Sequence, residues 1–256
     1  MAESRTSAGK TQEYGLWEVL AALSAKTWVD LTHAFDTGSP HYAADRPMTR
    51  ETLGTYERDG YRSEYFCLVG QWGTHVDPPA HFHEGLPAAD DIPVTDMLLP
   101  LAVINVHEKV AKNPDYALQR ADIAEWERRH GEIPPRAFVA LRSDWSKRWP
   151  DQSAIENRDP DGIAHTPGWS LDALKFLYET RGATAIGHET LDTDPGMAAS
   201  RGDFSLESYA LSRGHYQIGL MANLDRVPEA GAIVSVTWPK IKRGSGFPAR
   251  VFAILP

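Results

Sequence analysis

The sequence has only one cysteine, Cys67, among its 256 residues. It can therefore form no intrachain disulfide and no cluster of thiolate ligands around zinc, so imidazole, carboxylate or amide groups must hold any bound metal. Long apolar runs are also lacking. No stretch reaches the roughly 18 apolar residues of a membrane span, and the polar segment 1–10 lacks the apolar core of a signal peptide. These absences predict a cytoplasmic protein that does not enter a membrane.

Concentrated positive charge is missing as well. The formal net charge is -9 at pH 7, and the lysines and arginines are scattered along the chain. Binding to nucleic acid or to an anionic membrane needs clustered positive charge, so both kinds of partner are excluded. The expected partner is a small molecule or another protein chain, and a hydrophobic content of 42% allows a large buried core.

Hydrophobic periodicity predicts strands mixed with a few separated helices. We expect a polar tail and a packing helix within residues 1–26, and one domain over residues 27–256. This mixture predicts an α/β fold. The expected helices cover residues 14–23, 121–129 and 171–180, and the expected strands cover residues 28–32, 98–106, 137–141, 184–186, 232–238 and 250–255.

The segment 71–81, QWGTHVDPPAH, carries the strongest chemical signal. If it is extended as far as Asp77, then Gln71, His75 and Asp77 project to one face because side chains alternate along a strand. Gly73 would leave open space between them for a metal and its substrate. Trp72 and the other intervening side chains would pack into the body of the protein. The segment therefore predicts a three-ligand metal site.

The two prolines after this strand predict a sharp bend, because proline donates no backbone hydrogen bond and restricts the residue before it. The bend would return His81 to the site, where it could act as a general base. A His-x-Asp pair alone is structural in most proteins, but Gly73, the prolines and His81 add independent constraints. A satisfied buried histidine remains the alternative for His81.

The proposed ligand types indicate which metal would bind. Imidazole and carboxylate suit zinc, manganese or iron, and a neutral amide oxygen from Gln71 favours manganese, with zinc as the alternative. Three protein ligands leave positions open for water, which is typical of a catalytic site. We expect one ion per subunit.

Aromatic side chains near this segment could form a wall for a flat substrate. The candidates are Trp72, Phe82, His41 and Tyr42, although core packing is the competing explanation for each. His188, Glu189 and the loop 192–194 follow a predicted strand, where α/β proteins often place functional loops. Nucleophilic catalysis is not supported, because the sequence has no Gly-x-Ser-x-Gly elbow and Cys67 lies in an apolar strand.

The pattern Gln71-x-Gly73-Thr74-His75-x-Asp77-x-Pro79-x-His81 resembles the His-x-Gly-Thr-His-x-Asp-x-Pro-x-His signature of the cyclase family. That family includes bacterial kynurenine formamidases, isatin hydrolases and trans-dienelactone hydrolases. Residues 30–32, 38–40, 186–195, 222–224 and 240–255 resemble further family blocks in the same order. The resemblance implies a swivelling β/β/α domain with a mixed sheet and few helices, assembled as a homodimer or larger homo-oligomer. It also implies hydrolysis of an amide, lactam or lactone by metal-bound water.

By position, the resemblance makes His75 and Asp77 metal ligands, His81 the catalytic base and His215 a second active-site histidine. The formamidases have histidine where this chain has Gln71, and glutamate at the position matched to Ala222. These departures favour the isatin hydrolase branch, with one metal and a lactam substrate opened to isatinate. The alternatives are a small-lactone hydrolase, an arylformamidase, a lyase or cyclase, and a non-catalytic ligand-binding module.

Overall fold

The computed structural model describes residues 15–256, so the predicted polar tail lies outside the described residues. In the described part of the chain, no helix is long and apolar enough to cross a membrane. The helices are α1 (Gly15–Ser24), α2 (Tyr56–Asp59), α3 (His107–Lys112), α4 (Arg120–His130), α5 (Gln152–Glu156), α6 (Leu171–Lys175), α7 (Gly196–Ala199) and α8 (Ser205–Ser212). The strands are β1 (Trp28–Asp30), β2 (Thr49–Gly54), β3 (Ser63–Cys67), β4 (His75–Asp77), β5 (Leu98–Asn105), β6 (Ala117–Leu118), β7 (Phe138–Arg142), β8 (Gly168–Trp169), β9 (Ala185–His188), β10 (Tyr216–Gly219), β11 (Ala232–Thr237), β12 (Phe247–Pro248) and β13 (Arg250–Ile254).

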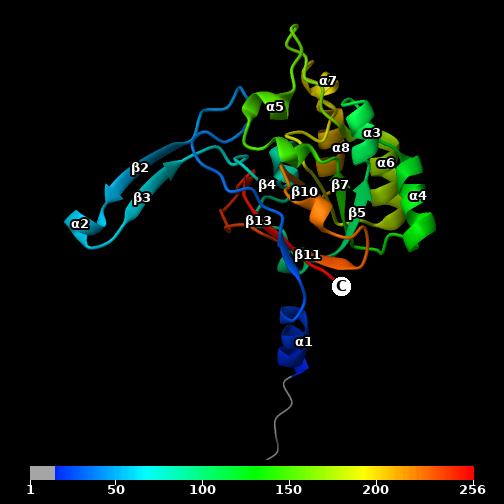
Figure 1. Ribbon diagram of the computed structural model, residues 1–256, viewed down its shortest axis with the longest axis horizontal. Helices are drawn as coiled ribbons and strands as arrows, with labels where there is room; N and C mark the ends of the chain where they lie inside the picture. The colour runs from blue at the N-terminus through cyan, green and yellow to red at the C-terminus, as the bar shows by residue number, and fades with distance from the viewer. Residues whose placement is uncertain (1–14) are drawn as a thin grey trace, which may run out of the picture.

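A mixed sheet organises the fold. Within residues 15–256 it contains nine strands in the order β1-β13-β11-β5-β7-β9-β10-β4-β12. The central strands β5, β7, β9 and β10 run parallel, and antiparallel strands extend the sheet on both sides. Helices α4, α6 and α8 lie together beside the parallel strands (Figure 1). The predicted α/β architecture with a mixed sheet and few helices is confirmed.

The central strands are apolar on both faces because both faces are covered. Val139 and Ile186 belong to a buried cluster that includes residues of α4 and α6, whereas Phe138 and Ala140 belong to a second cluster on the opposite face. Strands buried on both faces appear in a sequence as nearly continuous apolar runs, which explains why β5 and β7 could be predicted. The two clusters fix the parallel strands whose ends carry the site.

Three elements differ in detail from the expectations, although the predicted helix over residues 171–180 is present. The first helix forms over Gly15–Ser24, but none of its residues is buried, so it does not pack against the body. The helix that begins at Leu171 ends its α-helical turns at Lys175 and continues as a π-helical segment over Phe176–Arg181. Strand β10 was not predicted, because its four residues include a glutamine and a glycine that interrupt the apolar pattern.

Strands β2 and β3 form a separate two-stranded ribbon, which we call the arm (residues 49–67). The arm projects away from the body of the protein (Figure 1). It carries exposed apolar side chains, among them Tyr61, Tyr65 and Phe66. The arm is therefore a two-stranded ribbon that pairs with no other strand of the described residues.

Gly168 in β8 allows a close backbone approach. A Cβ atom there would lie 2.6 Å from the Pro195 nitrogen and 2.6 Å from the Thr193 carbonyl oxygen. Because both neighbours are backbone atoms, they cannot move aside as a flexible side chain could. The glycine therefore lets the loop after β9 lie directly on β8.

We predict that Gly168→Ala lowers the free energy of unfolding by about 1–3 kcal/mol, the usual cost of overpacking a closely packed site. Urea denaturation followed by circular dichroism measures the change. Gly15→Ala is the matched control, since a Cβ atom at Gly15 meets nothing within 4 Å. Equal unfolding midpoints for the two variants would contradict the prediction.

Candidate active site

A cavity of about 430 Å³ opens beside β4 and the C-terminal end of β9. Six of the residues predicted for the site line it. They come from the loop before the arm, from the segment that leads into β4, from β4 itself and from the turn that follows β4. Further walls come from the loop after β9 and from the region of α8. The cavity is lined by Tyr42, Asp45, Gln71, His75, Asp77, His81, Phe82, Leu191, Asp192, Phe204 and Glu207.

The floor of the cavity is a buried histidine and carboxylate pair. The Nε2 atom of His75 lies 3.3 Å from Oδ2 of Asp77, and both side chains are almost completely buried. The Nδ1 atom of His75 lies 2.7 Å from the carbonyl oxygen of Gly73, which can only accept a hydrogen bond. Nδ1 therefore carries the hydrogen, and a neutral His75 ring turns the lone pair of Nε2 toward the carboxylate.

Two electron-pair donors that face each other at this distance require a proton or a cation between them. Burial alone lowers the pKa of His75, but the neighbouring Asp77 carboxylate raises it above the usual value. Burial alone raises the pKa of Asp77, but His75 holds it well below the usual range. Without a metal ion the pair is an imidazolium and a carboxylate that share the Nε2 proton, and a bound cation would take the place of that proton.

Gly219 makes room for the His75 ring. In the antiparallel pairing of β10 with β4, Gly219 lies opposite His75. A Cβ atom at Gly219 would lie 2.8 Å from Cε1 of His75, so any larger residue would displace the imidazole. The same register places Gln217 opposite Asp77.

Gln217 is a site residue that the sequence analysis missed. Its side chain is buried, and its Nε2 donates to Oδ2 of Asp77 at 3.2 Å and to Oε1 of Glu207 at 2.8 Å. Its Oε1 accepts a hydrogen bond from the Thr193 hydroxyl at 2.5 Å. The available signal was a polar residue between apolar neighbours of a buried strand, because such a residue needs a buried partner.

The donor set fits a metal ion only if the amides contribute. Among the described residues, no group of three or more His, Cys, Asp or Glu side chains is placed to hold an ion. The Nε2 atom of Gln71 lies 3.2 Å from Oδ1 of Asp77, so Gln71 and Gln217 both bring amide groups to the carboxylate. In both contacts the amide NH2 group faces the carboxylate, so the atoms that now face the centre as metal donors are one imidazole nitrogen and the carboxylate oxygens, and an amide oxygen would join them only after the Gln71 amide turns.

Carboxyl groups crowd around this centre. Burial raises the pKa of Asp192 to about 7, with Asp194 and Asp77 adding to the effect. Burial likewise raises the pKa of Glu207 well above its usual value, and Asp77 again adds to it. These shifts favour the protonated, neutral carboxyls, and a cation bound beside them would lower their pKa values again.

His81 lies at the rim, above the buried pair. The short η1 turn (Pro79–His81) returns it after the bend, as predicted. Its Nε2 lies 4.0 Å from Oδ1 of Asp77, and its Nδ1 lies 3.5 Å from Nε2 of Gln71. The side chain is 29% exposed, so it can exchange protons with solvent and with a ligand in the cavity.

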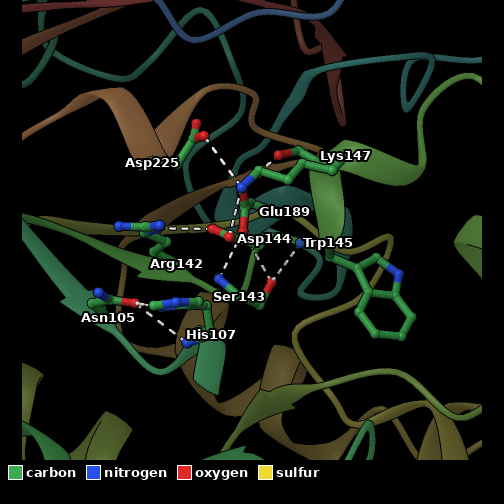
Figure 2. Close-up of polar contacts among 10 residues, drawn as sticks. Asn105, His107, Arg142, Ser143, Asp144, Trp145, Lys147, Glu189 and Asp225 are labelled. Atoms are coloured by element: carbon green, nitrogen blue, oxygen red, sulfur yellow. Dashed lines mark hydrogen bonds and ion pairs between the residues drawn. The ribbon is translucent and has the colours of Figure 1, made fainter. Parts of the chain in front are cut away.

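Residues 188 and 189 lie behind the site and have different environments. Both ring nitrogens of His188 are buried without a hydrogen-bond partner, and burial lowers its pKa to about 3, so the ring is neutral. Glu189 accepts hydrogen bonds from the backbone N–H and the hydroxyl of Ser143, as Figure 2 shows, and from the Ser146 hydroxyl at 2.5 Å. Glu189 therefore ties the end of β9 to the segment after β7.

Trp72 and His41, two of the predicted wall residues, do not line the cavity. Trp72 is completely buried, its Nε1 donates to the Asp36 carbonyl, and its ring stacks on that of His41 at a centroid distance of 4.3 Å. The cause is Gly73, whose φ of 63° turns the chain, so residues 71–77 are not one extended strand. The expected open space at Gly73 is also absent, because a Cβ atom there would lie only 3.1 Å from Cβ of Phe35.

The roles inferred for His215 and Ala222 are corrected as well. His215 lies at the N-terminal end of β10, away from the cavity lining, with its Nδ1 3.1 Å from the Thr184 carbonyl and its ring stacked on Tyr178. Ala222 lies beyond β10, where its backbone N–H donates to the Leu31 carbonyl. The residue that faces Asp77 is Gln217, which is neutral.

Comparisons with known proteins agree with this geometry. The isatin hydrolase of Roseibium aggregatum is 31% identical over 225 residues, which are 85% of this chain and 85% of that protein. Isatin hydrolase A from Ralstonia solanacearum has a TM-score of 0.88 and 30% identity, covering 97% of this chain and 100% of its own. Isatin hydrolase A from Labrenzia aggregata, bound to benzyl benzoate, has a TM-score of 0.86 and 32% identity, covering 94% of this chain and 98% of its own.

The family model named Cyclase matches residues 29–195, which include the whole segment from Gln71 to His81. This match covers more than half of the chain. The sequence signature, the fold and the relatives therefore lead to the same assignment: the chain belongs to the cyclase family.

Proposed function

We propose that this chain is a cytoplasmic, metal-dependent hydrolase that opens a cyclic amide such as isatin to the corresponding open-chain acid. The observation that carries the proposal is the buried pair of His75 and Asp77, with two amide groups beside it, at the floor of a cavity of about 430 Å³. The similarity to isatin hydrolases supports the choice of substrate. One of them, 28% identical, is bound to the product analogue thioisatinate.

His75 and Asp77 would hold the cation, and Gln71 would add its amide oxygen once its side-chain amide is turned, because its NH2 group now faces Asp77. When bound, a divalent ion there would supply Lewis-acid polarisation of the substrate carbonyl and a lowered pKa for a water molecule. The hard amide donor favours manganese, with zinc as the alternative.

The residues of the chain supply orientation and proton transfer. Tyr42 and Phe82 make edge contacts with Phe204 at centroid distances of 6.5 and 6.4 Å, and together they form an aromatic rim for a flat ring. His81 takes a proton from the attacking water and returns it to the lactam nitrogen as the C–N bond breaks. The reaction consumes one water molecule and yields an amine and a carboxylate.

The charge of the cavity favours a neutral substrate over an acidic lactone. Four lining residues carry carboxyl groups, Asp45, Asp77, Asp192 and Glu207, and the described lining contains no lysine or arginine. A dienelactone carries a carboxylate that would find no side-chain counter-ion here.

We predict that the purified protein converts isatin to isatinate and contains close to one metal ion per chain. EDTA dialysis should abolish turnover because it removes the electrophile, and added Mn²⁺ should restore it. The absorbance change on ring opening measures the turnover of isatin, and elemental analysis measures the metal content. Full activity of metal-free protein would contradict the metal-dependent mechanism, and binding of isatin without turnover would favour a ligand-binding module.

We predict that His81→Ala lowers kcat by about 10²–10⁴-fold, the usual contribution of a general base, while the metal content is unchanged. His215→Ala is the matched histidine control and should retain most of the activity, because His215 lies outside the cavity. Steady-state kinetics with metal analysis compares the two. A larger loss for His215→Ala than for His81→Ala would reverse the two assignments.

We also propose that the protein is a homodimer and that the arm is its main contact. Support comes from the exposed apolar side chains on a ribbon that pairs with no other strand of the described chain. Tyr65 and Phe66 are 55% and 47% exposed, and contact with a second copy of the chain would bury them and stabilise a hairpin that is marginal by itself.

Tyr65→Asp combined with Phe66→Asp should shift the protein toward monomer, because two carboxylates would have to be buried in the interface. Light scattering after size exclusion measures the mass. Val94→Asp is the control, since Val94 is 79% exposed and lies outside the arm. A wild-type monomer, or an arm variant with unchanged mass, would contradict the proposed contact.

A further inference from the structure

A second cavity of about 140 Å³ adjoins the active-site cavity. Tyr42, Leu191 and Asp192 line both cavities, so these three residues form the junction between them. The remaining walls come from the segment between α5 and β8 and from α7: Ile155, Glu156, Arg158, Ala164, Thr166, Gly196, Ala199 and Ser200.

The walls of the second cavity are closely packed. A Cβ atom at Gly196 would lie 2.7 Å from the Ala164 carbonyl oxygen and 2.7 Å from Oγ1 of Thr166, so α7 sits directly against residues 164–166. The Ser200 hydroxyl accepts a hydrogen bond from the Ala164 N–H at 2.8 Å. The cavity is therefore part of the folded scaffold and keeps its shape without a ligand.

Its junction with the active site is also held in place. Gln152 of α5 accepts a hydrogen bond from the His41 N–H at 2.8 Å and donates one to the His41 carbonyl at 2.8 Å. Because Tyr42 follows directly, this double contact fixes the backbone that carries the Tyr42 ring. The two cavities thus meet at a defined opening beside the aromatic rim.

The polar groups of the second cavity favour an uncharged ligand with a hydrogen-bond donor. The guanidinium of Arg158 already contacts the Glu156 carboxylate at 3.3 Å and the Gly162 carbonyl at 2.7 Å. Its charge is therefore balanced by Glu156, and it already makes hydrogen bonds within the protein. The groups that remain are the hydroxyls of Thr166 and Ser200 and the carboxyl of Asp192. Hydroxyl and carboxyl oxygens accept hydrogen bonds.

We propose that the second cavity is a subsite for a small, uncharged, hydrogen-bond-donating substituent on the aromatic ring of the substrate, such as a hydroxymethyl group. This inference rests on the proposed lactam hydrolysis. The volume of about 140 Å³ far exceeds the roughly 10–15 Å³ that holds one water molecule, so a substituent of several heavy atoms fits. The enzyme then acts on ring-substituted lactams in addition to isatin itself.

The test is a comparison of kcat/KM for isatin and for isatins that carry a hydroxymethyl, an ethyl or a carboxyl group at each position of the benzene ring. At one ring position, kcat/KM for the hydroxymethyl compound should equal or exceed kcat/KM for isatin. The carboxyl compound at that position should be about tenfold worse, because no free cation receives it. A loss of tenfold or more for the hydroxymethyl group at every position would overturn the subsite.

Two variants separate the subsite from the rest of the active site. Ala199→Phe fills the second cavity, so it should lower kcat/KM about tenfold or more for the hydroxymethyl compound and less than twofold for isatin. Met197→Phe is the control on the same helix, since Met197 is 36% exposed and does not line the cavity. Thr166→Val keeps the shape and should reduce the preference for hydroxymethyl over ethyl.

The outcomes distinguish this inference from the proposed function. If wild-type protein does not hydrolyse isatin, the proposed function fails. If isatin is hydrolysed normally, but Ala199→Phe lowers turnover of isatin and of the hydroxymethyl compound equally, only the subsite fails. Either a selective loss in Ala199→Phe or a lost preference in Thr166→Val supports the subsite, so the second variant still decides the matter if the first folds poorly.

Discussion

The contact between the His75 imidazole and the Asp77 carboxylate is the constraint on which the site depends. Both groups are buried, and the hydrogen bond to the Gly73 carbonyl turns the lone pair of Nε2 toward the carboxylate. In a dry environment that arrangement is unfavourable unless a positive charge lies between the two groups. Burial also raises the pKa values of the nearby carboxyls of Asp192 and Glu207, and a cation at the pair would oppose that shift.

Strand register converts this local requirement into a property of the fold. The antiparallel pairing of β10 with β4 puts Gly219 opposite His75 and Gln217 opposite Asp77. The glycine makes space for the ring, and the amide bonds to the carboxylate. A slip of one residue would exchange these positions and turn every side chain of the strand to the other face. The buried apolar faces of the central strands prevent such a slip.

The sequence predicted the parts of the site that are close together in the chain. Gln71, His75, Asp77 and His81 fall within one short segment, and apolar runs identified the central strands β5, β7 and β9. The contribution of Gln217 depends on the pairing of strands far apart in the chain, which local patterns do not encode. Trp72 packs into the body of the protein, as the alternation of side chains predicted, and its alternative role in a wall for the substrate is wrong.

The arm begins shortly after Tyr42 and Asp45 and ends shortly before Gln71, so both of its strands continue into walls of the active-site cavity. An insertion, a deletion or a shift of pairing within the ribbon would therefore move residues that touch the ligand. Changes in this hairpin, which is distant from the cavity in space, would therefore alter the walls of the cavity through the backbone that joins them.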